Sequence, residues 1–448
     1  MGDDSNTSES SRKRIARLER EINRLRLSPS LRLGEHITRA MRFPWRAPFL
    51  IVTLPILMLT IGFEMLGRRK VKVSKEISRY NLVNTRKNTV IMFPTNGIGF
   101  GHFTRMLATA NRMKKLDPDL EIIFFTTMPT LHILKEYGFP SHHVSGVNYF
   151  KHLNSSKWNA LIEEELVICL ETHSPSMFIF DGAFPYRGML RAISAFDGLD
   201  KVWMRRGTFK QGANIPVGSI SHFDLIIHPE DSVHRDAPEM DHGVESIGCP
   251  PIVLLEEDEL MSKESARRRL GLPLDSIVVY VQLGAGEINN IQSEIRMTID
   301  ALMNHQNVHA VLGESMLGSR LSVNLERVHL LRDYPNSMYY NAFDATIQAG
   351  GYNSFHEVRK FQIPTLFYPN LNTGMDDQLT RCKAAIEEGW GIVLEHREAH
   401  SIKSSVDDLL ENYENLEAKL TDNTDNMLLA VNLIARVNEK VANLPEEE

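Results

Sequence analysis

Cysteine is scarce in this sequence: the 448 residues contain three, Cys169, Cys249 and Cys382. They are odd in number, lie far apart and show none of the paired spacings typical of zinc sites. The sequence therefore argues against a disulfide framework, favours a reducing compartment and predicts three buried apolar thiols. Repeats of fixed period and domain-sized low-complexity segments are also lacking, which leaves ordinary globular domains.

Charge is low overall but unevenly distributed. The composition is 42% hydrophobic and 24% charged, and the length suggests two or three domains. The formal net charge is −7, yet residues 1–75 contain 16 Lys/Arg against 7 Asp/Glu, a balance of +9 that leaves −16 for the rest. A basic arm ahead of an acidic body predicts an anionic partner for the arm alone, either nucleic acid or a membrane surface.

The arm, residues 1–46, has the pattern of basic amphipathic helices. Apolar residues recur at three- and four-residue spacing in the Arg-rich stretch 11–27, and Ser28-Pro29 predicts the end of that helix. A second short basic helix is expected over residues 33–42. Residues 47–67 then form an apolar segment without charge until Glu64.

The apolar segment favours a membrane over nucleic acid as the partner of the arm. Its uncharged run is at the short end of the roughly 20 residues that span a bilayer, and it contains Pro48 and Pro55. It begins too far from Met1 for a cleaved signal peptide. Spanning the bilayer, dipping into one leaflet and packing as a hairpin on the protein all stay open. We expect a membrane-associated protein with cytoplasmic catalytic domains and no nucleic-acid partner.

Strands alternate with helices from about Asn88 onward. Short runs rich in β-branched and aromatic residues predict strands at 90–93, 120–126, 177–180, 201–204 and 225–228, and again at 277–282, 308–312, 345–347, 365–368 and 392–394. This alternation predicts an α/β protein with two Rossmann-like, doubly wound domains, 88–247 and 252–400, facing a cleft. A helical region, 401–448, follows them.

A glycine loop follows the first strand of the first domain. Gly97, Gly99 and Gly101 stand at alternate positions, and His102 comes next, where a helix begins. Glycines let a ligand approach the backbone, and an imidazole of near-neutral pKa can take a proton from a hydroxyl. The alternative is a tight turn with His102 as a capping residue.

Two further positions lie at strand ends. Asp181 ends the strand at 177–180, where a carboxylate can orient the His102 ring, or equally cap the next turn. Gly284 and Gly286 follow the strand that opens the second domain, where backbone N–H groups can bind a phosphate or simply make a turn. The close acidic pair Asp117-Pro118-Asp119 is interpreted as turn chemistry, and we expect no metal.

The segment 348–357 is the most specific pattern in the sequence. Gly350 and Gly351 turn the chain after a strand, and Asn353 or Ser354 is expected to cap the next helix, whose N-terminus can bind a pyrophosphate. Glu357, one turn into the helix, can accept hydrogen bonds from two ribose hydroxyls. A capping box of Ser354 and Glu357 is the alternative.

Asp377 and Gln378 precede a later helix. Their side chains suit sugar hydroxyls, because one accepts hydrogen bonds and the other both donates and accepts. Taken alone, the pair is better explained as a polar helix start.

Together these segments resemble the inverting GT-B glycosyltransferases, over roughly residues 88–400. That group includes the peptidoglycan lipid-linked N-acetylglucosaminyltransferase, galactolipid synthases and small-molecule UDP-glycosyltransferases. Gly351-Tyr352-Asn353-Ser354-x-x-Glu357 is similar to the family's Gly-Trp-Asn-Ser-x-x-Glu pattern, and Asp377-Gln378 and Gly101-His102 fall where the family has comparable pairs.

The sequence departs from that family at one position. Ala349 stands where the family often has a histidine that contacts the diphosphate. Contact with the diphosphate must then come from backbone N–H groups or another side chain, with Arg205 and Arg206 as weak candidates. Residues 27–34, leading into Pro44, also resemble the arm ahead of some bacterial surface-polysaccharide glycosyltransferases.

The resemblance implies a reaction and its participants. A UDP-sugar would be the co-substrate, bound by the second domain through the following residues: Gly284, Gly286, Gly350, Gly351, Asn353, Ser354, Glu357, Asp377 and Gln378. His102, oriented by Asp181, would be the base for a hydroxyl acceptor beside Gly99 and Gly101, with inversion and without cofactor or metal. The acceptor would be a lipid-linked glycan or a surface polysaccharide of the cell envelope. A nucleotide-sugar 2-epimerase and a non-catalytic subunit of this fold are the alternatives.

Overall fold

The computed structural model describes residues 29–65, 87–95, 100–146, 153–196, 198–205, 217–232, 240–284, 291–314, 325–373, 376–416 and 427–442. The chain divides into two compact units, Met1–Val83 and Asn84–Glu448, which are described separately.

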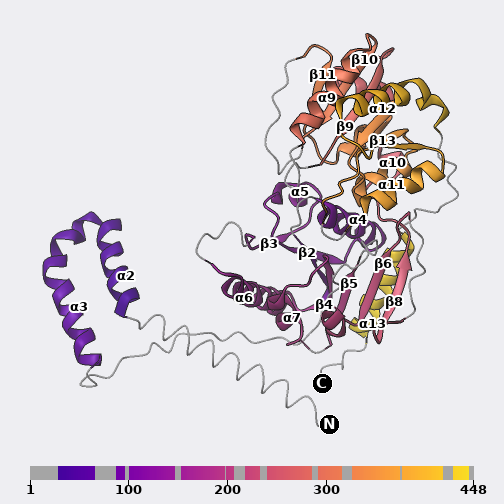
Figure 1. Ribbon diagram of the computed structural model, residues 1–448. Helices are drawn as coiled ribbons and strands as arrows, with labels where there is room; N and C mark the ends of the chain where they lie inside the picture. The colour runs from indigo at the N-terminus through magenta and orange to yellow at the C-terminus, as the bar shows by residue number, and fades with distance from the viewer. Residues whose placement is uncertain are drawn as a thin grey trace. The chain divides into compact units, whose positions relative to one another are not determined.

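Residues 29–65, the described part of the N-terminal unit, form two α-helices joined by a short 3₁₀ segment (Figure 1). They are α2 (Pro29–Arg42), η1 (Pro44–Phe49) and α3 (Leu50–Met65), and the two α-helices pack on each other. His36 Nε2 lies 2.8 Å from Thr53 Oγ1 and links them. The helix predicted over residues 11–27 lies outside the described residues. Among the residues that are described, no helix combines the length and apolar character that crossing a membrane requires.

The first α/β domain is built on an eight-stranded sheet in the order β3-β2-β1-β4-β5-β6-β8-β7. All neighbouring strands run parallel except β7 and β8. The strands are β1 Lys87–Pro94, β2 Glu121–Thr126, β3 Ser141–His143, β4 Pro175–Asp181, β5 Asp200–Met204, β6 Leu225–Pro229, β7 Met240–Asp241 and β8 Val244–Cys249. Strand order reverses between β1 and β4, where doubly wound sheets bind their ligands.

The second domain repeats this order in a six-stranded parallel sheet, β11-β10-β9-β12-β13-β14. Its strands are β9 Ile277–Gln282, β10 Val308–Gly313, β11 Val328–Leu331, β12 Ala345–Gln348, β13 Thr365–Phe367 and β14 Gly391–Val393. Here the order reverses between β9 and β12. The predicted fold class, two parallel-sheet α/β domains, is confirmed.

Helices cover both faces of each sheet, so the central strands, such as β2, β4 and β12, are buried on both sides and largely apolar. In the first domain α4 (Gly101–Leu116) and α5 (Leu131–Glu136) share one apolar core, and α6 (Ser155–His173) and α7 (Arg187–Ile193) share the other. In the second domain α9 (Gln292–Met303) and α12 (Ala399–Asn412) cover one face. The opposite face carries α8 (Lys263–Leu270), α10 (Tyr352–Lys360), α11 (Gln378–Glu387) and the 3₁₀ helix η5 (Asn336–Ala342).

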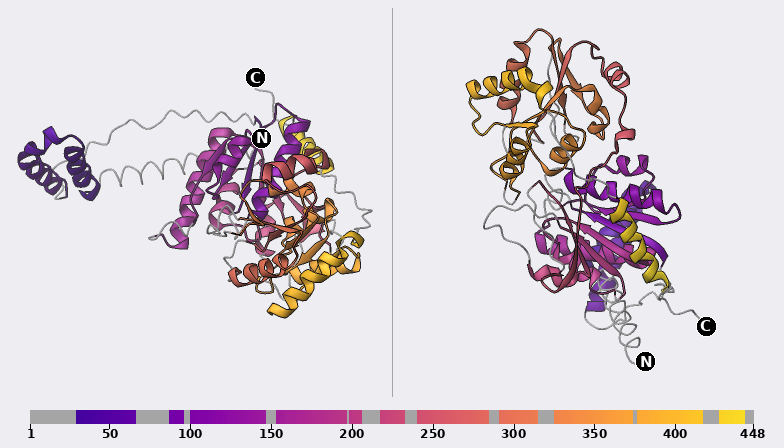
Figure 2. Two further views of the ribbon diagram at one scale, coloured as in Figure 1. Left: turned by 90° about the horizontal axis from the view of Figure 1, so that it is seen from above. Right: turned by 90° about the vertical axis from the view of Figure 1, so that its right-hand side faces the viewer.

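The C-terminal helical region is divided between the two domains. While α12 packs on α9, the last helix, α13 (Met427–Ala442), returns to the first domain and packs on α4 and β1. Leu429, Leu433 and Val437 are buried in the same core as α4. Figures 1 and 2 show α13, in yellow, beside strands of the first sheet. Sequence patterning predicted neither this return nor the 19-residue helix α6.

Candidate active site

The candidate site residues follow the strands at which each sheet changes order. Gly101 and His102 open α4 after β1, Asp181 ends β4, Gly284 follows β9, and Gly350 follows β12. Ligands of doubly wound sheets lie at these carboxyl ends. Gly99 and Gly286 lie outside the described residues.

His102 and Asp181 are hydrogen bonded. His102 Nδ1 lies 2.7 Å from Asp181 Oδ1, on a carboxylate that is completely buried, while the histidine ring is partly exposed. If Nδ1–H donates to Asp181, the ring presents Nε2 as an acceptor for a proton. Asp181 caps no helix, because α7 begins six residues later with Tyr186 at its N-cap. His102 is not a cap either, since Phe100 is the N-cap residue of α4.

A buried arginine completes this pair. Arg105 Nε donates to Asp181 Oδ2 at 3.1 Å and its Nη2 to Oδ1 at 2.7 Å, while the same Nη2 lies 2.9 Å from His102 Nδ1. Burial alone raises the pKa of Asp181, but Arg105 and His102 reverse this and hold it below its ordinary value. Asp181 therefore stays ionised, and its two oxygens hold both basic side chains in place. Arg105 was not predicted from the sequence, although His102 and Arg105 are three residues apart and so share one face of the helix.

The helix after the 348–357 segment begins earlier than predicted. Its N-cap residue is Gly351, and no side chain caps it, so Asn353 and Ser354 lie inside the first turn. The expectation that one of them caps the helix is wrong, and the capping box of Ser354 with Glu357 is excluded. A helix start without a side-chain cap leaves backbone N–H groups directed at an incoming anion. Among the described residues, an added Cβ on Gly351 would meet no atom within 4 Å.

Gly350 is required by the turn itself. Its φ is +75°, which side chains disfavour, and an added Cβ would lie 2.2 Å from Cys382 Sγ. Gly284 likewise has a positive φ of +93°, and an added Cβ there would meet none of the described atoms within 4 Å. The close approach of α11 therefore leaves room for glycine alone at the turn that precedes α10.

Glu357 points toward η5. Its Oε1 accepts a hydrogen bond of 3.3 Å from Ser337. Burial raises the pKa of Glu357 to about 7, although hydrogen bonds from Ser337 and Tyr340 oppose the shift. A carboxylate poised between its two protonation states responds strongly to hydroxyl donors, because these stabilise the charged form.

Asp377 and Gln378 are both engaged in local structure. Asp377 is the N-cap residue of α11 and accepts from the backbone N–H of Thr380 at 3.1 Å. Gln378 Oε1 accepts from the backbone N–H of Asn370 at 2.9 Å. The polar helix start is thus real, and a sugar contact by these side chains stays a prediction. The pair Asp117-Pro118-Asp119 also forms a turn, in which Asp117 Oδ1 accepts from the backbone N–H of Asp119 at 3.1 Å.

The starts of α4 and α10 meet across the two domains. Asn353 Nδ2 donates to the carbonyl of Gly101 at 3.2 Å. The centre of the Tyr352 ring lies 5.1 Å from the guanidinium carbon of Arg105 and 5.7 Å from that of Arg381. The candidate base of the first domain and the helix start of the second are therefore brought to one place.

Arg381 is the centre of a buried ion cluster that joins the domains. Its Nη2 donates to Asp231 of the first domain at 2.7 Å and to Asp376 of the second at 2.6 Å. His356 Nε2 lies 3.1 Å from Asp231. Burial raises the pKa of Asp231, but Arg381 and His356 outweigh it and hold the pKa well below its usual range. Arg205, a weak candidate for the diphosphate, is paired instead with Asp241, and Arg206 lies outside the described residues.

These two domains, with their repeated strand order and facing helix starts, define a GT-B glycosyltransferase-like fold, as the resemblance implied. The glycotransferase of kitacinnamycin has a similar structure, with a TM-score of 0.55 and 12% identity over 79% of this chain and all of that one. CalG4, the calicheamicin glycosyltransferase, gives a TM-score of 0.52 and 15% identity, over 80% of this chain and 99% of its own. A putative UDP-N-acetylglucosamine 2-epimerase from Listeria monocytogenes gives a TM-score of 0.51 and 12% identity, over 81% of this chain and 99% of its own. At these identities the likeness concerns the fold. No family model and no curated protein sequence matches the chain.

Proposed function

We propose that this protein is an inverting glycosyltransferase that moves a sugar from a UDP-sugar to a hydroxyl group. The observation that carries the proposal is the contact between Asn353 and the carbonyl of Gly101, 3.2 Å long. It sets the His102–Asp181 pair beside the uncapped start of α10. A candidate general base and an anion-binding helix start are the two parts that transfer from a nucleotide diphosphate requires.

The proposed reaction is a single displacement. The acceptor hydroxyl gives its proton to His102 Nε2 while its oxygen bonds to the anomeric carbon. The bond from that carbon to the diphosphate oxygen breaks, and its electron pair leaves with UDP. The backbone N–H groups at the start of α10 stabilise the charge that develops on the leaving group, which removes the need for a metal.

Side chains of the second domain would hold the donor. Glu357 would accept hydrogen bonds from the ribose, and Asp377 and Gln378 would contact the sugar. Asn353 Oδ1 is buried and has no partner among the described residues, so it can accept a hydrogen bond from a donor hydroxyl. We also propose that the α/β domains lie in the cytoplasm, because the scarcity of cysteine favours a reducing compartment.

A panel of nucleotide sugars tests this proposal. Thermal shift and UDP release would be measured with each donor, with and without lipid-linked and soluble hydroxyl acceptors. Transfer predicts that UDP release depends on the acceptor. An epimerase would instead convert the donor with no acceptor present. This alternative is tested because a putative 2-epimerase is among the similar structures. Donor binding without any turnover would point to a non-catalytic subunit.

The pKa of Glu357 gives the proposed ribose contact a pH dependence. Ribose hydroxyls bind the ionised carboxylate, and with a pKa of about 7 that form is lost as pH falls. Donor affinity should therefore drop about tenfold between pH 8 and pH 6. Glu357→Gln should bind more weakly and without this dependence, as isothermal titration with a UDP-sugar would show. The exposed Glu395→Gln is the matched control, and a pH dependence that persists in Glu357→Gln would refute the ribose contact.

We further propose that the N-terminal unit binds an anionic membrane, which would bring the active site to a lipid-linked acceptor of the cell envelope. Large apolar side chains of this unit are exposed: Ile51 by 81%, Met41 by 75% and Trp45 by 64%. Arginines precede the apolar segment, and Arg68, Arg69 and Lys70 follow it. Apolar side chains flanked by cations match the interface of an anionic bilayer.

Vesicle binding tests the membrane proposal. Ile51→Asp combined with Val52→Asp should reduce co-sedimentation with phosphatidylglycerol-containing vesicles at least about tenfold, because two carboxylates would enter the apolar layer. Leu274→Asp, at an exposed leucine of the second unit, should leave binding unchanged. Equal binding of the double variant and the natural protein would rule out this surface.

A further inference from the structure

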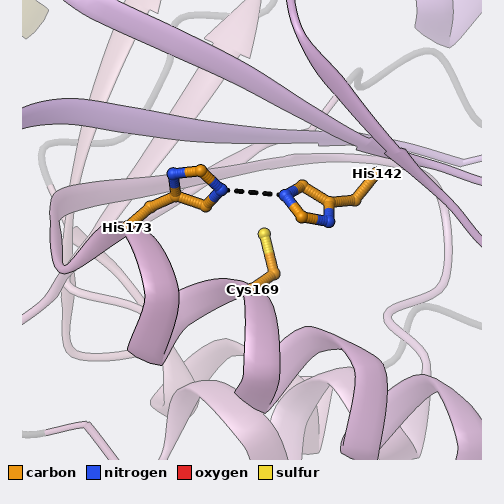
Figure 3. A group of neighbouring side chains, drawn as sticks. All are labelled: His142, Cys169 and His173. Atoms are coloured by element: carbon orange, nitrogen blue, oxygen red, sulfur yellow. Dashed lines mark hydrogen bonds between the residues drawn. The ribbon is translucent and has the colours of Figure 1, made fainter. Parts of the chain in front are cut away.

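A group of three side chains with metal-binding chemistry lies in the first domain, apart from the candidate active site (Figure 3). His142 comes from the edge strand β3, and Cys169 and His173 come from the last turns of α6. Their ligand atoms all lie within 4.8 Å of one another. Imidazole nitrogen and thiolate sulfur are the ligands that zinc prefers.

The local structure directs these atoms toward one point. Cys169 and His173 are four residues apart on α6, so they project from the same face of the helix. His142 approaches from β3, and its Nε2 lies 2.8 Å from Nε2 of His173. Figure 3 shows the thiol of Cys169 beside the facing nitrogens of the two rings.

The spacing of the two rings suits a shared ion. Their centres are 5.0 Å apart and their planes are inclined by 76°. Two imidazoles on one tetrahedral zinc, with Zn–N bonds of about 2.0–2.1 Å, also hold their ring centres about 5 Å apart. Binding therefore requires the rings to turn their nitrogens toward the sulfur, with little movement of the ring centres.

Accessibility is also suitable for an ion. Cys169 is fully buried, whereas both histidines are partly exposed, so the cluster combines a protected sulfur with an approach from solvent. A reducing compartment, as the scarcity of cysteine indicates, keeps this thiol available. Three protein ligands leave a fourth position of a tetrahedral ion for water.

We propose that His142, Cys169 and His173 form a binding site for a divalent transition-metal ion, with zinc as the natural occupant. On binding, the Cys169 thiol loses its proton to solvent, and both imidazoles bind through neutral Nε2. The ion cross-links β3 to the end of α6. Because β3 has three residues and, of the strands that the structure describes, pairs with β2 alone, this link fixes a weakly held strand.

Cobalt substitution tests the site directly. The untagged, reduced full chain would be stripped with a chelator and titrated with Co²⁺ and then Zn²⁺. We expect one ion per chain, a thiolate-to-cobalt charge-transfer band that zinc displaces, and a rise in melting temperature of roughly 5 °C with saturating zinc. No charge-transfer band in the natural protein would overturn the proposal.

Single substitutions identify the ligands. Cys169→Ser should abolish the charge-transfer band, and His142→Gln and His173→Gln should each weaken binding at least about tenfold. His143→Ala is the matched control, because this exposed histidine is the next residue on the same strand. A band that survives Cys169→Ser, or an equal loss in His143→Ala, would refute the assignment.

Two safeguards keep the outcome decisive. Each variant is unfolded thermally in the presence of chelator. A variant whose melting temperature equals that of the metal-free natural protein counts as folded. If Cys169→Ser does not fold, the His142→Gln/His173→Gln double variant replaces it, since both side chains are partly exposed. The test needs no sugar donor, so its result is independent of the proposed glycosyl transfer.

Discussion

Replacing His102 with alanine is expected to lower the rate of sugar transfer by about 10²–10⁴-fold, the usual contribution of a general base. The acceptor hydroxyl would lose the group that takes its proton, and buried Asp181 offers no substitute because Arg105 holds both of its oxygens. Donor binding should change little, since the proposed donor contacts are made by the second domain. The measurement is kcat for transfer, together with the dissociation constant of the UDP-sugar by calorimetry.

A histidine outside the site provides the control for this prediction. His132→Ala alters an exposed ring on α5 of the same domain and should keep full activity. Loss of transfer with retained donor binding in His102→Ala alone supports a catalytic base. Unchanged transfer would remove His102 from the mechanism, and loss of donor binding would place it among the donor contacts.

Arg381→Met is expected to lower the free energy of unfolding by about 3–5 kcal/mol, because it leaves a buried carboxylate without its counter-ion. Asp231 is fully enclosed and depends on Arg381, which contacts both of its oxygens, and on His356. The folded-state pKa of Asp231 lies below the ordinary pKa of an aspartate. The ion pair of Asp231 with Arg381 therefore stabilises the fold fully at pH values above the ordinary pKa. This stabilisation is lost as pH falls through the folded-state pKa. Urea denaturation at pH 7 therefore measures the full contribution.

The same helix supplies a matched control. Lys383 forms an exposed ion pair with Glu395, and Lys383→Met should cost less than about 1 kcal/mol. Arg381→Met combined with Asp231→Leu should recover part of the loss, because neither charge of that pair is then stranded. Equal stability of the Arg381→Met and Lys383→Met variants would show that the ion cluster around Arg381 does not stabilise the contact between the two α/β domains.

Local pattern was sufficient for elements whose signal lies within a few residues. The β-branched runs at 277–282 and 345–347 form β9 and β12, whose limits are close to those predicted. The predicted start of α10 is wrong, because the polar residues Asn353 and Ser354 have the chemistry of a helix cap. The N-cap residue is Gly351, and at Gly350 before it an added Cβ would lie 2.2 Å from Cys382 Sγ of another helix, a contact that local pattern does not show.

The sequence by itself determined the two α/β domains and the glycine turns at their switch points, because periodicity and glycine placement are local signals. It also placed His102 and Asp181 at the ends of elements, at the edge where ligands of such sheets bind, and Glu357 one turn into the helix after Gly351. Only the tertiary structure brought Arg105 to Asp181, 76 residues away, and Arg381 to Asp231, 150 residues away. It alone set His142 beside Cys169 and His173. Pairings of this kind depend on which elements become neighbours, and packing of the sheets and helices decides that rather than the spacing of residues along the chain.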